Sequence, residues 1–332
     1  MKIMIYGDVH WCESSSIVRG MGRKYSQRLE NLIRSVTWVE SMAYNNNCEL
    51  IIMLGDFFDK SILTAQEVSA LNDILWSDIK KIFITGNHEI GRADRTFSTI
   101  DLFDSFPNSE VISQPVEMNI ANKKCLFLPY FLEKDRPDLS KYDHYDYIFS
   151  HNDIKGLQLG PFISKEGFEI EKIENACTYY FNGHIHNGMF VGKNIINIGN
   201  LSGQNFSEDA LNYSHNVVIL DTETNDLEFF ENPNAFNFYK LGLLTSPEDL
   251  KSLKSHAVVS MTLDPDNKDL KQFIENDDRI VCKRILYKDN SKSVDIKEDF
   301  SSVDYLQKFV EFVKNNMEMT DIVEEELSKV IA

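Results

Sequence analysis

Short apolar runs alternate with longer polar segments over about the first 230 residues. In chain order the runs are IMIY, ELIIMLGD, KKIFITGN, KKCLFLPY, YDYIFSH, TYYFNGH, NIINIGN and HNVVILDT. Their length, their content of Ile, Val, Phe and Leu, and the Gly, Asn and Asp around them are typical of buried strands. Residues 28–43 carry apolar side chains at a spacing of about 3.6, which predicts a helix with one buried face. This alternation predicts an α/β domain.

After the third apolar run, the apolar stretches become shorter and are separated by a turn. Residues 117–120 and 124–128 are short stretches separated by a turn, as in a β-hairpin, so the sheet is expected to be mixed. A turn-rich cluster, Asn-Pro-Asn at 232–234, then marks a boundary. We therefore expect a main domain at residues 1–232.

Beyond this boundary the pattern predicts smaller elements. HAVVSMTLD, DLKQFIEN and DRIVCKRILY indicate a strand, a helix and a strand of a small domain at residues 233–302. Residues 303–332 carry apolar side chains at helical spacing, which predicts one or two amphipathic helices at the end of the chain.

Charge limits the functions open to this chain. Its 332 residues include 34 Lys and Arg against 52 Asp and Glu, a formal net charge of -18. Such a chain repels polyanions, which excludes a nonspecific nucleic-acid coat protein. Residues 101–250 carry 10 basic and 23 acidic side chains, whereas residues 11–34 carry 5 basic and 2 acidic ones. Any contact with nucleic acid must therefore be local.

Cysteine spacing and hydropathy indicate the compartment. The five Cys residues are widely spaced and form no CxxC pair, which fits reduced thiols in a cytosol. No apolar run approaches the roughly 20 residues of a membrane-spanning helix. The apolar run near the N-terminus is too short for the core of a signal peptide. We expect a cytoplasmic protein with no membrane partner.

Polar clusters rich in metal-ligand residue types follow five of the apolar runs. They are Gly-Asp-Val-His at 7–10, Gly-Asp-Phe-Phe-Asp at 55–59, Gly-Asn-His-Glu at 86–89, Ser-His at 150–151 and Gly-His-Ile-His at 183–186. The carboxyl ends of strands in α/β sheets gather in one place, so the clusters should converge. Asp, His and Asn without thiolate suit Mn, Fe or Zn, and the candidates exceed what one ion can use. Two adjacent ions predict hydrolysis of a phosphoester.

In this order the clusters resemble the calcineurin-like metallophosphoesterase superfamily, whose pattern is DxH, GDxxD, GNH(D/E), a lone His and GHxH. The resemblance covers residues 1 to about 205. It implies an α/β fold, a four-layer α-β-β-α sandwich with mixed sheets, followed by a small α+β C-terminal capping domain. It also implies two divalent ions, with Mn²⁺ expected and Mg²⁺, Fe²⁺ or Zn²⁺ as alternatives.

The resemblance also assigns roles by position. Asp8, His10 and His186 would hold the first ion. Asn87, His151 and His184 would hold the second, and Asp56 would bridge the two. His88 would act as a general acid toward the leaving oxygen or stabilise the charge on it, with Asp59 orienting it.

Within the superfamily the chain is similar to the SbcD-type subunit of the bacterial SbcCD complex and to its phage relatives. The similar features are GDVHW followed by Arg19, Arg23 and Lys24, the pair Pro129-Tyr130, and residues 197–206 after GHIH. The chain is short for a cellular member, so a phage-encoded protein in the host cytoplasm is the closer comparison. Trp11-Cys12 departs from the Leu-Gly that often follows DxH in that branch.

This likeness implies a DNA exonuclease or endonuclease subunit that is a homodimer and works with an SMC-like coiled-coil ATPase. Arg19, Arg23 and Lys24 would contact DNA phosphates, or else lie on a solvated helix face. Residues 303–332 would dock on the ATPase, or else cap their own domain. A basic partner would bring DNA to this acidic chain. Two other functions stay open: a stand-alone phosphoesterase acting on a nucleotide or a phosphoprotein, and a noncatalytic assembly subunit.

Overall fold

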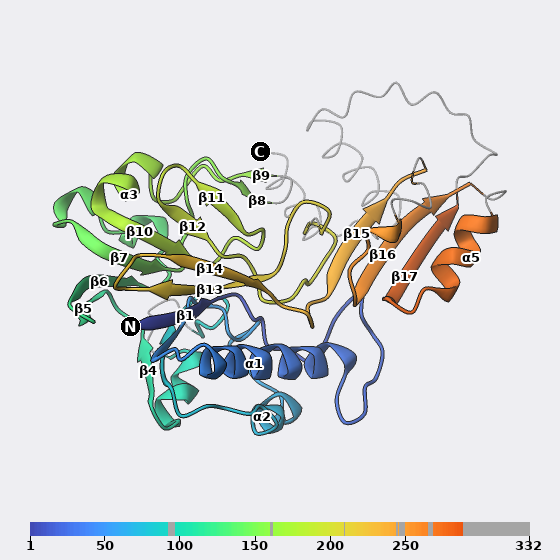
Figure 1. The fold of residues 1–332 in the computed structure, drawn as a ribbon, viewed down its shortest axis with the longest axis horizontal. Helices are drawn as coiled ribbons and strands as arrows, with labels where there is room; N and C mark the ends of the chain where they lie inside the picture. The colour runs from blue at the N-terminus through green and yellow to red at the C-terminus, as the bar shows by residue number, and fades with distance from the viewer. Residues whose placement is uncertain are drawn as a thin grey trace, which may run out of the picture. The chain divides into compact units, whose positions relative to one another are not determined.

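The computed structural model describes residues 1–91, 97–159, 162–208, 210–243, 245, 250–264 and 268–287. Their strands form two six-stranded sheets, a three-stranded sheet and a two-stranded ribbon (Figure 1). The helices are α1 (Gln27–Asn45), α2 (Ala65–Leu71), α3 (Ile170–Ala176) and α5 (Lys268–Asn276), with short 3-10 turns η1 (Thr99–Ser105), η2 (Glu133–Asp135) and η3 (Leu139–Lys141). Among these described segments no helix is long and apolar enough to cross a bilayer.

The first sheet has the strand order β14-β13-β1-β2-β3-β4. Its strands are β1 (Lys2–Tyr6), β2 (Leu50–Met53), β3 (Lys80–Ile84), β4 (Ser109–Ile112), β13 (Asn216–Asp221) and β14 (Leu227–Glu231). The strands β1 to β4 are parallel, whereas β13 runs antiparallel to both of its neighbours. This sheet is mixed, as predicted.

The second sheet has the order β11-β12-β10-β7-β6-β5. Its strands are β5 (Val116–Ile120), β6 (Lys123–Leu128), β7 (Tyr145–Ser150), β10 (Cys177–Asn182), β11 (Met189–Val191) and β12 (Ile195–Asn197), and the ribbon is β8 (Gln158–Leu159) with β9 (Phe162–Ile163). The predicted hairpin is β5 and β6, an antiparallel pair whose turn residues Ala121 and Asn122 both have left-handed backbone. The inner strands are parallel, so this sheet is mixed too.

Alternating side chains divide the interior into three apolar layers. On β1, Met4 and Tyr6 point into a core with α1 and α2, whereas Ile3 and Ile5 point into a core shared with the second sheet. A third core lies between the second sheet and α3. The order is therefore helices, sheet, sheet, helix (Figure 1), which confirms the predicted four-layer sandwich.

A small parallel sheet with the order β15-β16-β17 follows. The predicted strand, helix and strand are β16 (Ala257–Leu263), α5 and β17 (Ile280–Tyr287), while β15 (Asn237–Leu241) was not predicted. This sheet has its own core and a second contact in which Val18 packs against Phe236 and Phe238. The division at residue 232 stays a prediction, and residues 303–332 lie outside the described part of the chain.

Glu67 in the first turn of α2 braces the loop that follows β1. Its side chain is fully buried, accepts hydrogen bonds from the Thr64 and Glu13 amides at 2.8 and 2.9 Å, and pairs with Lys60 at 2.9 Å. Glu67→Ala should lower the free energy of unfolding by about 2 to 4 kcal/mol, because two amides lose their acceptor. Glu67→Gln, which keeps one acceptor oxygen, should cost less. Urea unfolding measures both, and equal losses would contradict this account.

Candidate metal centre

The five predicted clusters meet where parallel strands of both sheets end. Asp8, Asp56 and Asn87 follow β1, β2 and β3 of the first sheet, and His151 and His184 follow β7 and β10 of the second. The two edges are joined directly. The His184 amide donates to the two Asp8 carboxylate oxygens at 2.9 and 3.0 Å, and His151 Nδ1 donates to the Leu54 carbonyl at 2.6 Å.

The side chains include the two sets expected for two ions, and a third group, His10, Asp56 and His88, shares one residue with each set. Asp8, His10 and His186 bring their ligand atoms within 4.8 Å of one another, and so do Asp56, His151 and His184. Asn87 joins the second set, since its Oδ1 lies 3.1 Å from His151 Nε2 and 2.9 Å from His184 Nδ1. That these sets bind ions stays a prediction.

Asp56 lies between the two sets. One carboxylate oxygen accepts a hydrogen bond from the His88 amide at 2.9 Å. The other lies 3.2 Å from His151 Nε2 and 3.9 Å from His10 Nε2, one ring from each set. Burial raises the pKa of Asp56, but the nearby His151, His10 and His88 rings outweigh burial and lower it. The carboxylate is therefore ionised where a bridging ligand would stand.

Each of the four imidazoles in these sets is held by the nitrogen that points away from the cluster. The pairs are His10 Nδ1 with Asp59 at 3.0 Å, His151 Nδ1 with the Leu54 carbonyl at 2.6 Å, His184 Nε2 with Asp153 at 3.1 Å and His186 Nδ1 with Glu208 at 3.0 Å. All four partners accept, so in each neutral ring the held nitrogen carries the proton, which leaves the other nitrogen as the one available to a metal ion. This is the usual arrangement of metal-binding histidines.

Two further observations fit a cation here. His10 Nε2 is buried without a hydrogen-bond partner and lies 3.9 Å from a carboxylate oxygen of Asp8 and from one of Asp56. A buried lone pair beside two carboxylates suits a divalent ion. For His151, burial lowers the pKa, but Asp56 raises it to about 9, so positive charge is favoured between these two residues as well. The residues present fit one ion in each set.

Four of the predicted ligands have left-handed backbone. The φ angles of Asp8, His10, Asp56 and His184 are 49°, 49°, 54° and 74°. Such values are uncommon outside glycine and cost of order 1 to 3 kcal/mol each. They are held by bonds between the first two clusters, such as the His10 amide donating to the Asp56 carbonyl at 2.9 Å. Strain of this kind gathers at active sites.

Gly183 lets the two sheets approach at this point. A Cβ at this position would lie 2.6 Å from the Leu54 carbonyl oxygen, 2.8 Å from Asp8 Oδ2 and 2.9 Å from His151 Nδ1. Gly183→Ala should therefore weaken binding of both ions at least about 10-fold, because it displaces a residue of each set. Calorimetric titration with Mn²⁺ measures the effect. Gly242→Ala, at a glycine with open space around it and no left-handed backbone, is the control, and equal binding by both variants would contradict the prediction.

The structure places Asp59 differently from the expectation that it orients His88. The Asp59 carboxylate lies 3.0 Å from His10 Nδ1 and 3.9 Å from His88 Nδ1. The backbone carbonyl of Asp59, not its carboxylate, accepts from His88 Nδ1 at 2.9 Å. The reason is burial: His10 is fully buried and needs the acceptor, whereas 41% of the His88 side chain is exposed.

Other residues of the centre were not predicted. Asp153 and Glu208 hold two of the imidazoles, and their only sequence signals are their positions shortly after His151 and after residues 197–206. Glu89, whose carboxylate could in principle bind a metal, is buried and instead accepts hydrogen bonds from the Gly86 and Phe58 amides at 2.7 and 3.1 Å. Its side chain therefore stabilises the loops that follow β3 and β2. His215, in the loop before β13, is buried and donates from Nδ1 to the Asn200 carbonyl at 3.0 Å.

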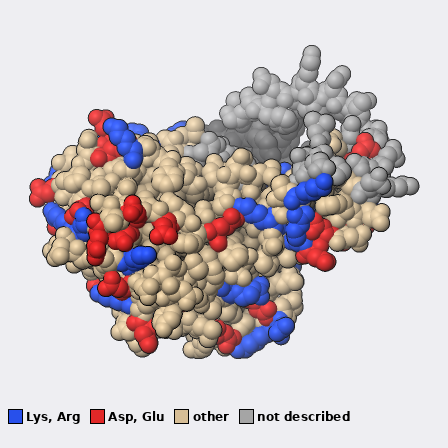
Figure 2. Space-filling model, in the orientation of Figure 1, with Lys and Arg blue, Asp and Glu red and all other residues tan. Residues whose placement is uncertain are grey.

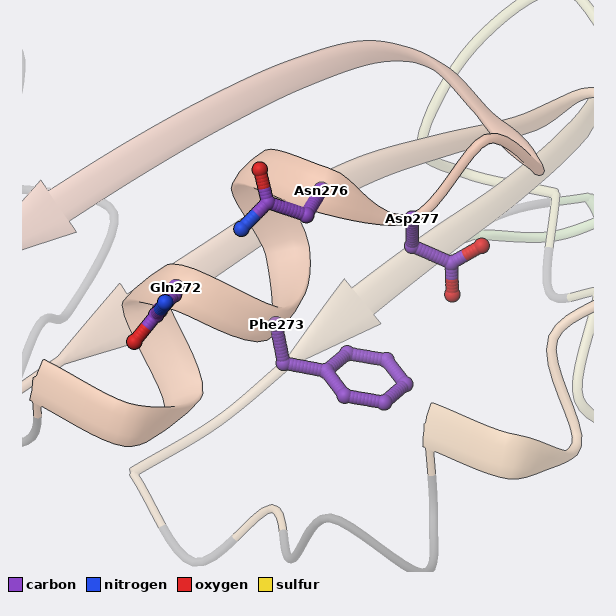
Figure 3. Close-up of a pocket in the computed structure, with 4 residues that line it drawn as sticks. All are labelled: Gln272, Phe273, Asn276 and Asp277. Atoms are coloured by element: carbon purple, nitrogen blue, oxygen red, sulfur yellow. The ribbon is translucent and has the colours of Figure 1, made fainter.

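A pocket elsewhere on the molecule contains none of the predicted metal ligands. Figure 3 shows a pocket of about 380 Å³ beside α5, and its described lining residues are Gln272, Phe273, Asn276 and Asp277. None of them belongs to the predicted site. The convergence of ligand atoms, and not cavity volume, therefore locates the candidate centre.

Known proteins are similar to this chain. The similar solved structures include a novel archaeal phosphodiesterase (17% identity, 70% of this chain and 99% of that one, TM-score 0.38), a hypothetical protein from Thermus thermophilus (11%, 70% and 100%, TM-score 0.38) and a single mutant of Vps29 from Entamoeba histolytica (11%, 70% and 99%, TM-score 0.30). None of the curated proteins matches the sequence. The family model described as calcineurin-like phosphoesterase matches residues 1–188, more than half of the chain, including all five clusters. The chain belongs to the calcineurin-like phosphoesterase family.

Proposed function

We propose that this chain is the nuclease subunit of a DNA-processing complex. It would hydrolyse DNA phosphodiesters with two divalent ions, expected to be Mn²⁺, in DNA repair, recombination or phage DNA metabolism. The observation that carries the proposal is the pair of ligand sets with Asp56 between them. The likeness of GDVHW, the basic residues after it and residues 197–206 to SbcD-type subunits supports DNA as the substrate.

The roles of the side chains follow from their hydrogen bonds. Bound ions would activate a water molecule and neutralise charge on the phosphate. His88, whose ring lies 4.7 Å from that of His10, has its Nδ1 proton on the Asp59 carbonyl. Nε2 is then the nitrogen left for a substrate oxygen, and it donates only when the ring is doubly protonated. We assign to it the stabilisation of the departing 3′-oxygen.

The basic residues of the loop before α1 would supply contacts to the DNA backbone. Arg19 and Arg23 are exposed, whereas Lys24 is paired with Asp73 at 2.8 Å. Replacing Arg19, Arg23 and Lys24 with Ala should weaken DNA cleavage and flatten its salt dependence, with Lys24 contributing least, while a small phosphodiester is hydrolysed as before. Rates measured across a salt series test this. Equal loss on both substrates would count against DNA contact.

The charge of the chain supports a partner. On the face shown in Figure 2, the described acidic and basic side chains are interspersed and form no continuous basic surface. A chain of net charge -18 would bind DNA weakly in the absence of a partner. We propose an SMC-like ATPase as the partner, with a homodimer of this chain in the complex and with residues 303–332 as the docking segment. Deletion of residues 303–332 should abolish copurification with the ATPase, and unchanged copurification would refute the docking role.

A substrate comparison tests the proposed function. The purified chain, with and without a candidate SMC-like coiled-coil ATPase, is given Mn²⁺ and linear duplex DNA, mononucleotides or a phosphopeptide. We expect cleavage of DNA, increased by the ATPase. Turnover of only the nucleotide or phosphopeptide would favour a stand-alone phosphoesterase. An absence of turnover on any substrate would favour a noncatalytic assembly subunit.

A further inference from the structure

Glu208 lies directly behind one of the predicted ligands of the first ion. Its Oε1 accepts a hydrogen bond from His186 Nδ1 at 3.0 Å, and only 5% of the Glu208 side chain is exposed. This bond leaves Nε2 of His186 as the nitrogen available to an ion held with Asp8 and His10. Glu208 lies beyond residues 1–188, the part of the chain that the family model covers.

The backbone around Glu208 fixes its carboxylate. Oε2 accepts from the Gln204 amide at 2.7 Å, so each carboxylate oxygen has its own donor. The same segment is anchored at both ends on the residues that lead into and form β15. The Gly203 amide donates to the Phe236 carbonyl at 3.0 Å, and the Ala210 amide donates to the Phe238 carbonyl at 3.2 Å. Backbone hydrogen bonds to β15 and to the residue before it therefore fix the position of Glu208 beside His186.

The space around this pair is small. A cavity of about 10 Å³ lies beside it, lined by His186, Glu208, Tyr213 and His215 among others. That volume holds at most about one water molecule. Removal of the Glu208 carboxylate should therefore leave His186 Nδ1 to water. We expect the orientation of His186 to depend on Glu208.

We propose that Glu208 is a positioning residue, which fixes the tautomer and the direction of His186 for the first ion. The inference rests on the proposed two-metal function. Asp153, which accepts from His184 Nε2 at 3.1 Å, is its counterpart at the second ion. The chain therefore offers a matched pair of variants, one behind each set of ligands.

Calorimetric titration of the metal-stripped full-length chain with Mn²⁺ tests this role. Glu208→Ala should weaken one of two binding events about 10- to 100-fold and leave the other unchanged. Glu208→Gln, whose amide oxygen can still accept from His186, should recover part of the loss. Asp153→Ala should weaken the other event. Thermal unfolding of each metal-stripped variant reports whether it is folded, and Glu208→Gln serves if the alanine variant is not.

A double-mutant cycle separates positioning from a general structural effect. In a His186→Ala background Glu208→Ala should have no further effect, whereas in a His184→Ala background it should weaken the remaining Mn²⁺ binding as it does in the wild type. Wild-type affinity in Glu208→Ala, or an equal loss in both backgrounds, would overturn the inference. A wild-type chain that binds one ion would instead contradict the proposed two-metal function. In a chain that binds one ion, Glu208 is still a positioning residue if the effect of Glu208→Ala on the affinity for that ion requires His186.

Discussion

Replacing Asp56 with alanine should abolish the binding of both metal ions and lower phosphodiester hydrolysis about 10³-fold or more. Asp56 is the residue whose carboxylate approaches a ring of each set, at 3.2 Å from His151 Nε2 and 3.9 Å from His10 Nε2. Without it, each set loses its shared anion, and the two ions lose the ligand that holds them together. Metal content after dialysis and the hydrolysis of a small phosphodiester measure the two effects.

The matched control for this change is Asp73→Ala, which removes an acidic partner of Lys24 outside the centre. It should leave metal content and turnover as in the wild type. Circular dichroism checks that the Asp56 variant is folded. A folded Asp56→Ala protein that keeps both ions would show that the carboxylate does not bridge them.

Replacing His88 with alanine should lower DNA cleavage about 10²- to 10⁴-fold while both ions remain bound. His88 contacts the centre through its backbone amide and the Asp59 carbonyl, so loss of its ring removes none of the residues of the two ligand sets. The loss should be smaller for a p-nitrophenyl phosphodiester, because that leaving group departs without a proton. Parallel kinetics on the two substrates measure this difference.

The control for His88 is His144→Ala, at an exposed histidine that bonds to the Asn175 carbonyl and Thr178. Its rates should equal those of the wild type on both substrates. If His88→Ala cleaves DNA at the wild-type rate, or loses metal, the role assigned to His88 is wrong.

The positions of the candidate ligands could be predicted because each stands directly after a strand. Asp8 and Asp56 follow apolar runs whose ends must meet at one edge of a sheet, so short-range pattern and general topology suffice. The hairpin of β5 and β6 and the helix α1 were predictable for the same local reason. The layering required the family resemblance, because the alternation of Ile3 and Met4 between two cores is invisible in a fully apolar run.

The residues that support the ligands could not be predicted from local pattern. Glu208 and Asp153 come from irregular segments without periodicity, and they reach His186 and His184 only through the tertiary fold. The bond between the Asp59 carboxylate and His10 was not predicted for a similar reason, since sequence proximity to a motif does not reveal which nearby imidazole is buried. The strand β15 was missed because it closely follows the turn-rich boundary cluster that argued for a loop.

The requirement for two ions is tested by the rate at which the metal-stripped chain hydrolyses a small phosphodiester as Mn²⁺ is added. We expect little turnover below one ion per chain and a plateau at two, since water activation and charge neutralisation are shared between the two sets. A plateau at one ion per chain, or turnover that does not depend on added metal, would contradict it.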